Sequence, residues 1–287
     1  MKKRCTIWIV CFLIAFEMLS IMVYADSGPK PSVHITFENM GEEVCYGTLL
    51  SKSDSTGPAS VWDGNPDNIY NYELDMDIWQ AFVDYEDADG YFFLQRGWLC
   101  SESKELNWTY YPPSSFKILL YYPESNTYTV SDIYERYAFD SYFRVMMDGL
   151  EIGYVDDKAY DFTWELISLI CRVVITIVLE IAIAWLFGLR KKRLITTVLG
   201  VNFVTQIGLN VFLNIINYNR GAYMFIFCYV LLEILVFIVE AIFYVILFRK
   251  SGDTRISTMR TVSYALTANI VSFIGGMVIA KLVPGIF

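Results

Sequence analysis

Residues 164–193 read WELISLICRVVITIVLEIAIAWLFGLRKKR, a long apolar run that ends in basic side chains. About 20 apolar residues are enough for a helix to cross the hydrocarbon core of a bilayer. Basic residues that flank such a run are usually retained on the cytoplasmic side of the membrane. This stretch therefore predicts a span that begins outside the cytoplasm and ends inside it.

Three further apolar segments of similar length follow, so the C-terminal part (164–287) has four predicted spans. The loops after the first and third spans are basic, whereas the loop after the second carries Arg220 alone. We therefore expect a four-helix transmembrane bundle in the cell membrane, with both basic loops in the cytoplasm. The spans are 164–188, 194–217, 224–248 and 261–283, and the basic loops are 189–193 and 249–260.

Charge is divided unevenly along the 287 residues. Residues 26–163 carry 25 acidic and 8 basic side chains, a net charge of −17, whereas residues 164–287 have a net charge of +6. An acidic surface disfavours nucleic acid, because phosphates need a basic partner. With 55% hydrophobic residues and a mean hydropathy of +0.40, the chain is too apolar for a disordered protein and unlike an ordinary soluble enzyme.

The first 25 residues fit a secretory signal peptide. Basic residues at 2–4 precede an apolar core at 6–16, and the small residue Ala25 precedes a suitable cleavage point. Glu17 favours removal of this segment, because a retained helix would hold a carboxyl group in lipid. The alternative is an uncleaved anchor helix. Both alternatives export residues 26–163, to the side that the basic loops also predict.

Residues 26–163 predict an extracytoplasmic β-rich domain of the sandwich type. Several segments are rich in the aromatic and branched side chains that strands favour. Asp148-Gly149 predicts a tight hairpin between two of them, and 123–126 predicts a longer one. One short helix is expected at 75–85. The predicted strands are 33–37, 44–50, 91–99, 116–122, 127–130, 143–147 and 150–155, in an order that the sequence does not reveal.

Cys45 and Cys100 are the cysteines of this exported part. Export brings them to a compartment in which disulfides persist, so a disulfide and a pair of buried thiols both stay open. Aromatic residues are abundant here as well. They form either the core or a stacking platform for sugars or peptides, and the tryptophans concerned are Trp62, Trp79, Trp98 and Trp108.

Polar side chains inside the predicted spans are the main candidate functional residues, because such groups are costly in lipid. Counting about 1.5 Å per residue from each span's midpoint places them in two layers. The inner layer, toward the cytoplasm, has Glu180, Asn202, Glu240 and Asn269, one from each span. The outer layer has Arg172, Asn210 and Glu233, with a predicted Arg172–Glu233 ion pair, and Gln206 lies near the middle.

Three roles for these residues stay open. Glu180 and Glu240 share a proton or bind a cation, as in coupled transport, because two close carboxyl groups do not both ionise. Alternatively, the polar groups only hold the helices together. In the third role, Glu180 or Arg172 pairs with a partner membrane protein.

The sequence predicts neither an enzyme nor a cofactor or metal site. It has no glycine-rich phosphate loop, no cluster of metal-binding His and Cys, and no nucleophile elbow. His34 is the one histidine of the chain. The acidic turn at 84–90 does not match the ligand spacing of a calcium loop.

The segments FENMG (37–41), CYGTLLSK (45–52), WTYYPP (108–113) and PGIF (284–287) resemble a family of bacterial membrane proteins. These proteins pair an exported N-terminal domain with a multi-helix C-terminal domain. The resemblance implies this architecture and an envelope location, and it implies no activity. We expect a binding or accessory protein whose outer domain meets an envelope ligand, and whose helices contact the lipid bilayer and a membrane-protein partner. The alternative is a small ion- or proton-coupled transporter or channel.

Overall fold

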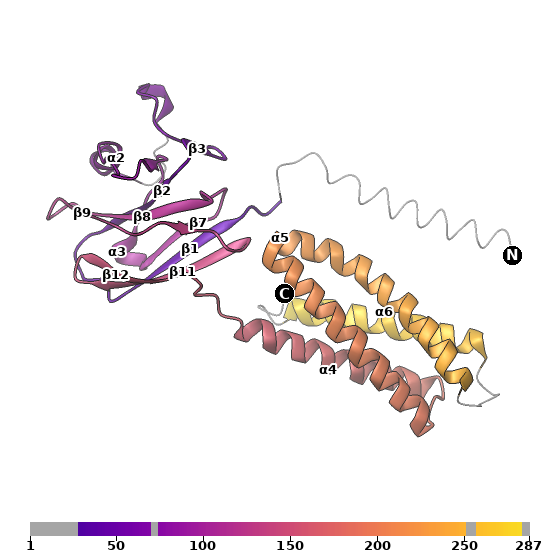
Figure 1. Ribbon diagram of the computed structural model, residues 1–287. Helices are drawn as coiled ribbons and strands as arrows, with labels where there is room; N and C mark the ends of the chain where they lie inside the picture. The colour runs from indigo at the N-terminus through magenta and orange to yellow at the C-terminus, as the bar shows by residue number, and fades with distance from the viewer. Residues whose placement is uncertain (1–27, 70–73, 251–256, 283–287) are drawn as a thin grey trace.

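The computed structural model describes residues 28–69, 74–250 and 257–282 (Figure 1). A β-rich part with two main sheets comes first, and three long helices form the C-terminal part. The protein is therefore an α+β protein with the order of parts that the sequence predicts. The predicted signal peptide (1–25) lies outside the described residues.

The first sheet brings the two ends of the β-rich part together. Its strands are β1 (Ser32–Glu38), β7 (Glu105–Trp108), β11 (Asp140–Asp148) and β12 (Glu151–Asp156), in the order β12-β11-β1-β7. β1 runs parallel to β11, and Ser32 pairs with Asp140, which is 108 residues later. Local sequence signals do not encode a pairing over such a distance, so the strand order was not predictable.

The hairpin of β11 and β12 is confirmed, but its turn lies one residue later than predicted. Asp148 pairs with Glu151, so Gly149 and Leu150 form the turn. Gly149 has a φ of 64°. A glycine in the first turn position satisfies the positive φ that a two-residue hairpin of this kind requires.

The second sheet has six strands, with β8 (Ser115–Tyr122) next to β2 (Tyr46–Ser51). The predicted hairpin around 123–126 is confirmed, because Tyr122 pairs with Thr127. The predicted strand at 91–99 is wrong in part: Gln95, with a φ of 58°, separates two short strands. The remaining strands are β5 (Phe92–Phe93), β6 (Trp98–Leu99), β9 (Thr127–Val130) and β10 (Tyr134–Glu135); outside this sheet lie β3 (Ser55–Thr56), β4 (Ala59–Ser60), η1 (Pro66–Asn68) and α3 (Cys100–Ser103).

Two cores hold the β-rich part together. The first contains side chains from both sheets, with Ile35, Trp108 and Phe143 from one sheet and Leu49 and Ile118 from the other. The second core lies on the other face of the six-stranded sheet. There α2 (Met76–Val83), the helix expected at 75–85, buries Ile78, Trp79 and Phe82 against Leu50, Leu119 and Tyr121 of the sheet.

Three helices follow, α4 (Thr163–Leu186), α5 (Lys192–Lys250) and α6 (Thr258–Leu282). The backbone N–H of Thr163 donates to Oδ1 of Asp161 at 2.9 Å, which marks the start of α4. After its end, Gly188 adopts a φ of 70°, a conformation typical of helix C-termini.

The second and third predicted spans are one element of 59 residues, α5, and not two separate helices. The predicted loop between them is helical except at Gly221, which has a φ of 77° and a ψ of 175°. The chain reverses direction there, so α5 has a first arm (192–220) and a second arm (222–250). Nδ2 of Asn202 in the first arm lies 2.7 Å from the Tyr244 hydroxyl in the second arm, so the arms lie side by side.

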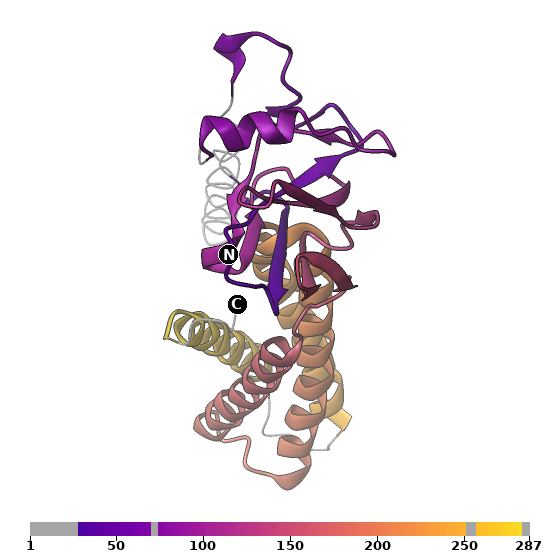
Figure 2. The same ribbon diagram turned by 90° about the vertical axis from the view of Figure 1, so that its left-hand side faces the viewer.

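The bend of α5 contacts the β-rich part, which lies at this end of the helices in Figure 2. The backbone N–H of Phe139 donates to the carbonyl oxygen of Tyr218 at 2.9 Å. A Cβ atom on Gly221 would lie 2.5 Å from Cε1 of Phe139. The rings of Tyr137 and Tyr160 also approach the Tyr218 ring, with centroids 6.3 and 6.2 Å apart. Only glycine fits this bend, because both the backbone angles and the Phe139 ring exclude a side chain.

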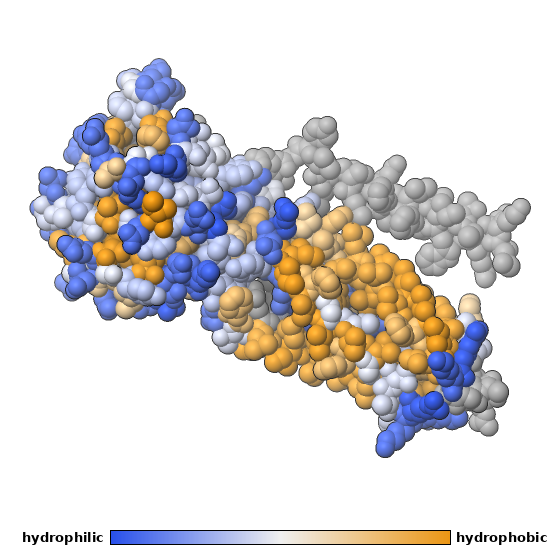
Figure 3. All heavy atoms as spheres, in the orientation of Figure 1, coloured by the Kyte–Doolittle hydropathy of each residue, from blue (hydrophilic) through white to orange (hydrophobic). Residues whose placement is uncertain are grey.

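Two of the described helices are long and apolar enough to cross a membrane, Leu166–Leu186 within α4 and the whole of α5. Their outward side chains are apolar, including Val178, Val204 and Ile226, which are each more than half exposed. Figure 3 shows this apolar surface covering the helices, with polar side chains at the end far from the sheets. These features agree with a membrane protein.

Candidate functional site

The helices bring polar side chains from distant parts of the chain into one buried network. Nδ2 of Asn202 in α5 donates to Oε2 of Glu180 in α4 and to the Tyr244 hydroxyl. All three side chains are completely buried. The bonds therefore join α4 to both arms of α5 in a place that water does not reach.

The second carboxyl group of the network belongs to Glu240, which is also completely buried. Its Oε1 accepts a hydrogen bond from Thr205 at 2.6 Å, and its Oε2 accepts one from Asn269 at 2.8 Å. These bonds join the second arm of α5 to the first arm and to α6. The structure thus brings together Glu180, Asn202, Glu240 and Asn269, the four residues of the predicted inner layer.

Thr205 and Tyr244 were not predicted from the sequence, because uncharged hydroxyl groups are common in apolar helices. The spacing of these two residues along the helix could have predicted that they belong to the network. Thr205 lies three residues after Asn202, and Tyr244 lies four residues after Glu240. Residues at these spacings share a helix face, so both hydroxyls were candidates for the same polar interior.

The network has carboxyl groups but no basic partner for them. Within the described residues, neither Glu180 nor Glu240 forms an ion pair, and the ion pairs found involve Lys117 and Arg144 of the β-rich part. Burying an isolated charge costs several kcal/mol even after the protein relaxes. The partners that the structure shows for these two carboxyl groups are therefore uncharged hydrogen-bond donors: Asn202, Thr205 and Asn269.

The predicted outer layer is less tightly connected. Arg172 donates to Oγ of Ser168 from Nε at 3.0 Å and from Nη2 at 2.6 Å, and its guanidinium lies 5.7 Å from the Phe225 ring centroid. Arg172 and Glu233 line the same small cavity of about 20 Å³, and their ion pair stays a prediction. The other polar residues around this cavity are Thr176, Gln206, Asn210, Tyr229 and Ser272.

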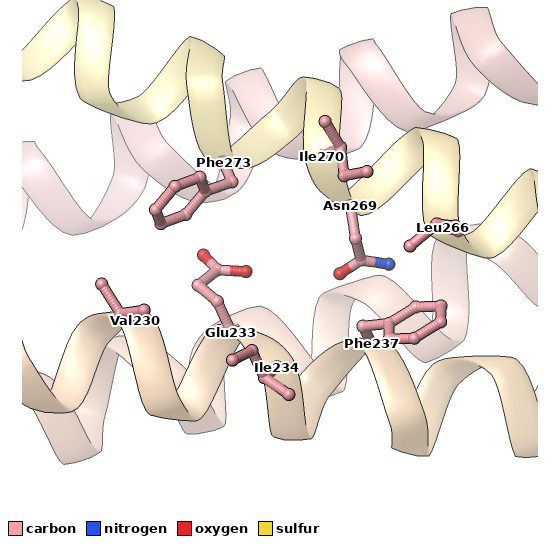
Figure 4. A pocket seen from close by; sticks show the side chains of 8 residues that line it. All are labelled: Val230, Glu233, Ile234, Phe237, Leu266, Asn269, Ile270 and Phe273. Atoms are coloured by element: carbon pink, nitrogen blue, oxygen red, sulfur yellow. The ribbon is translucent and has the colours of Figure 1, made fainter. Parts of the chain in front are cut away.

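Glu233 also lines a second cavity, an apolar groove of about 180 Å³ between α6 and the second arm of α5. Figure 4 shows Glu233 from α5 and Asn269 from α6 pointing into the space between the two helices. The other lining residues are apolar: Val230, Ile234, Phe237, Leu266, Ile270 and Phe273. The predicted layers separated Glu233 from Asn269, whereas the structure places both in one groove.

The β-rich part contains a larger cleft, of about 410 Å³, that the sequence analysis did not locate. Aromatic and acidic side chains line it, including Trp62, Tyr85, Tyr91 and Glu86. Of the four tryptophans considered for a binding platform, Trp79 and Trp108 are core residues. Trp98 packs against the first core, and Trp62 is the one that lines the cleft.

Asp87, which lines this cleft, forms a buried ion pair with Lys117. Nζ of Lys117 lies 2.9 Å from Oδ1 of Asp87 and 2.5 Å from Oδ2 of Asp89. Burial alone would raise the pKa of Asp87, but hydrogen bonds from Lys117 and from the backbone N–H groups of Tyr91 and Asp89 hold it below its usual range. Lys117 offsets one of the two carboxylate charges of Asp87 and Asp89, so with the exposed carboxyl group of Glu86 the cleft is negatively charged.

Cys45 and Cys100 are buried neighbours with free thiols. The backbone N–H of Cys100 donates to the carbonyl oxygen of Cys45 at 2.8 Å. Burial raises the pKa of Cys45 to about 12 and that of Cys100 well above its ordinary value. Thiols of this kind react slowly, because the thiolate is the reactive form.

The single histidine is a structural residue in this fold. The two ring nitrogens of His34 lie 2.8 Å from Oγ of Ser32 and 2.8 Å from Oδ1 of Asn107. Its ring also stacks on Tyr142, with centroids 4.9 Å apart. Both nitrogens are therefore engaged within the first sheet.

Comparisons with protein-family models, with curated proteins and with solved structures find no match to this chain.

Proposed function

We propose that this protein is an integral cell-membrane protein and a binding or accessory subunit, whose β-rich domain meets an envelope ligand or partner. The observation that carries the proposal is the cleft of about 410 Å³ in that domain. Aromatic rings beside a carboxyl group are a common recognition surface, because rings stack on a ligand and the carboxylate fixes its orientation. The contact between Phe139 and the bend of α5 gives the domain a defined position on the helices.

In this proposal the helices form a four-span bundle, because α5 crosses the membrane twice. A straight helix of 59 residues is about 89 Å long, about three times the thickness of the hydrocarbon core. The bend at Gly221 divides it into arms that each exceed the length of one crossing. The hydrogen bonds from Asn202 to Tyr244 and from Thr205 to Glu240 support this back-to-back arrangement.

The distribution of basic residues supports an orientation with the β-rich domain outside. Arg249 donates to Thr258, and Arg260 donates to the carbonyl oxygen of Phe187, so three helix ends meet at the end far from the sheets. The basic run at 190–193 follows Phe187 in the chain. Clusters of Lys and Arg are retained in the cytoplasm, which puts this end inside.

Photo-crosslinking in intact cells tests the binding role. A photoreactive residue replaces Phe92, which lines the cleft and is 44% exposed, and a control replaces Tyr154, which is 65% exposed and does not line it. We expect an adduct from position 92 that position 154 does not form and that Trp62→Ala weakens. Identical adducts from both positions, or a protein that runs alone after mild detergent extraction, would contradict the proposal.

A second candidate function is ion- or proton-coupled transport, favoured by the buried carboxyl groups of Glu180 and Glu240 without a basic partner. The test is ion flux into vesicles that contain the purified protein. We expect Glu180→Gln and Glu240→Gln to abolish the flux, and Glu151→Gln on the exposed surface of β12 to leave it unchanged. Equal flux in all four proteins would reject this function.

A further inference from the structure

The groove between α6 and the second arm of α5 opens to the outside of the helices. Val230, Ile234 and Ile270, which form its rim, are 41%, 49% and 49% exposed. Phe237 and Phe273 close its two ends in Figure 4. In the proposed membrane setting, a molecule dissolved in the lipid has direct access to this groove.

Two hydrogen-bond acceptors in the groove have no partner. Among the residues that the structure describes, nothing donates to Oε2 of Glu233 or to Oδ1 of Asn269, although both atoms are buried. Asn269 is only 5% exposed, and its Nδ2 is already occupied by Glu240 and the carbonyl oxygen of Ala265. The unsatisfied polar atoms of the residues that line the groove are therefore oxygen atoms.

The chemistry of these two oxygens determines which ligand group can bind between them. An acceptor is satisfied only by a donor, and lipid chains contain none. A carboxylate favours a donor with a positive charge, because charge-assisted hydrogen bonds are about twice as strong as neutral ones. The apolar walls favour an apolar body attached to that donor.

We propose that this groove binds a lipid-soluble amine, with its ammonium group between Glu233 and Asn269 and its hydrocarbon part along Ile234 and Ile270. A water molecule would satisfy the same two oxygens, but it would bring no positive charge to the Glu233 carboxyl group and no apolar part to the walls of the groove. The groove adjoins the buried network, because Asn269 lines the groove while its Nδ2 donates to Glu240 of the network.

The experiment uses the full chain in phosphatidylcholine nanodiscs, with empty nanodiscs as the baseline. A dodecylamine with a fluorophore at the far end of its chain is the probe, and unlabelled dodecylamine and dodecanol compete with it. We expect dodecylamine to compete at least about tenfold more strongly than dodecanol, as a charged hydrogen bond implies. Glu233→Gln should remove this difference, and Ile270→Trp should weaken both competitors by filling the groove.

Glu180→Gln is the matched control, because Glu180 is an intramembrane carboxyl group that does not line the groove. It should bind the amine as the wild type does. Equal competition by amine and alcohol, unchanged binding by Glu233→Gln, or equal losses in Glu233→Gln and Glu180→Gln would each overturn the inference. The inference rests on the proposed membrane setting, but different results contradict the inference and the setting. A chain that does not insert into nanodiscs contradicts the setting, whereas an inserted chain without amine selectivity contradicts only the groove.

Discussion

Replacing Gly221 by alanine tests whether the bend of α5 determines how the protein is assembled. Gly221 has a φ of 77° and a ψ of 175°, a backbone conformation that is essentially restricted to glycine. Holding another residue in such a region costs about 1–3 kcal/mol. The new Cβ would also lie 2.5 Å from the ring of Phe139, so the ring or the bend must move.

Gly208→Ala is the matched control in the same helix. Nothing lies within 4 Å of a Cβ at Gly208, which is helical. There the change should stabilise the protein by about 1 kcal/mol, because alanine is a better helix former than glycine. The same chemical change is therefore expected to have opposite effects at the two positions.

The assay is thermal unfolding of the full chain in detergent, followed by tryptophan fluorescence. We expect a lower midpoint for Gly221→Ala and an equal or higher midpoint for Gly208→Ala. Adding Phe139→Ala to Gly221→Ala should relieve the clash with the ring but not the backbone strain. The midpoint should therefore fall by less in the double variant than the sum of the decreases in the two single variants. Equal midpoints for Gly221→Ala and Gly208→Ala would show that the bend has no requirement for glycine.

Three further predictions concern buried polar groups and thiols. Lys117→Met leaves Asp87 buried without its counter-charge and should destabilise the protein by about 3–5 kcal/mol in urea unfolding, with recovery on adding Asp87→Asn. The pKa of Asp87 is lower in the folded than in the unfolded protein, so ionised Asp87 stabilises the fold at a pH above its unfolded pKa. This stabilisation is lost as the pH falls through the folded pKa. In Lys117→Met, the free energy of unfolding should therefore change less with pH in the acidic range. In the native protein at pH 8, Cys45 and Cys100 should not react with iodoacetamide. After unfolding without reductant both should react, and peptide mass mapping measures the alkylation. If alkylation requires a reductant, the two cysteines form a disulfide instead. Asn202→Ala removes bonds to two helices and should lower the stability measured by SDS titration by about 0.6–1.7 kcal/mol, and an unchanged titration would show that the network does not stabilise the helices.

Much of the fold follows from local sequence patterns. Alternation predicted β1, one face of which is buried, and a run of aromatic and branched residues predicted β8, which is buried on both faces. Asp148-Gly149 predicted the β11–β12 hairpin to within one residue. Local signals failed where distant residues interact. The parallel pairing of β1 with β11 depends on a contact across most of the domain, and the cleft combines Trp62 with residues at 83–93 only after folding.

The polar residues of the apolar helices were identifiable because a charged or amide side chain is rare within an apolar run. Their grouping was harder to predict. Depth along separate helices placed Glu233 and Asn269 in different layers, but long side chains on adjacent helices reach the same groove. Depth along a helix also does not reveal which groups form hydrogen bonds with one another. The hydrogen bonds of the Thr205 and Tyr244 hydroxyls therefore became known only from the structure.

From the order of its residues alone, this chain specifies an acidic β-rich part followed by long apolar helices, because apolar runs and charge clusters report directly on the solvent that each segment prefers. Only the tertiary structure decides that α5 turns back at one glycine and that two carboxyl groups share a buried network. It alone also decides that two unpaired oxygens face one groove. These features depend on distances between side chains of different helices, and such distances are set by packing, which no single segment contains.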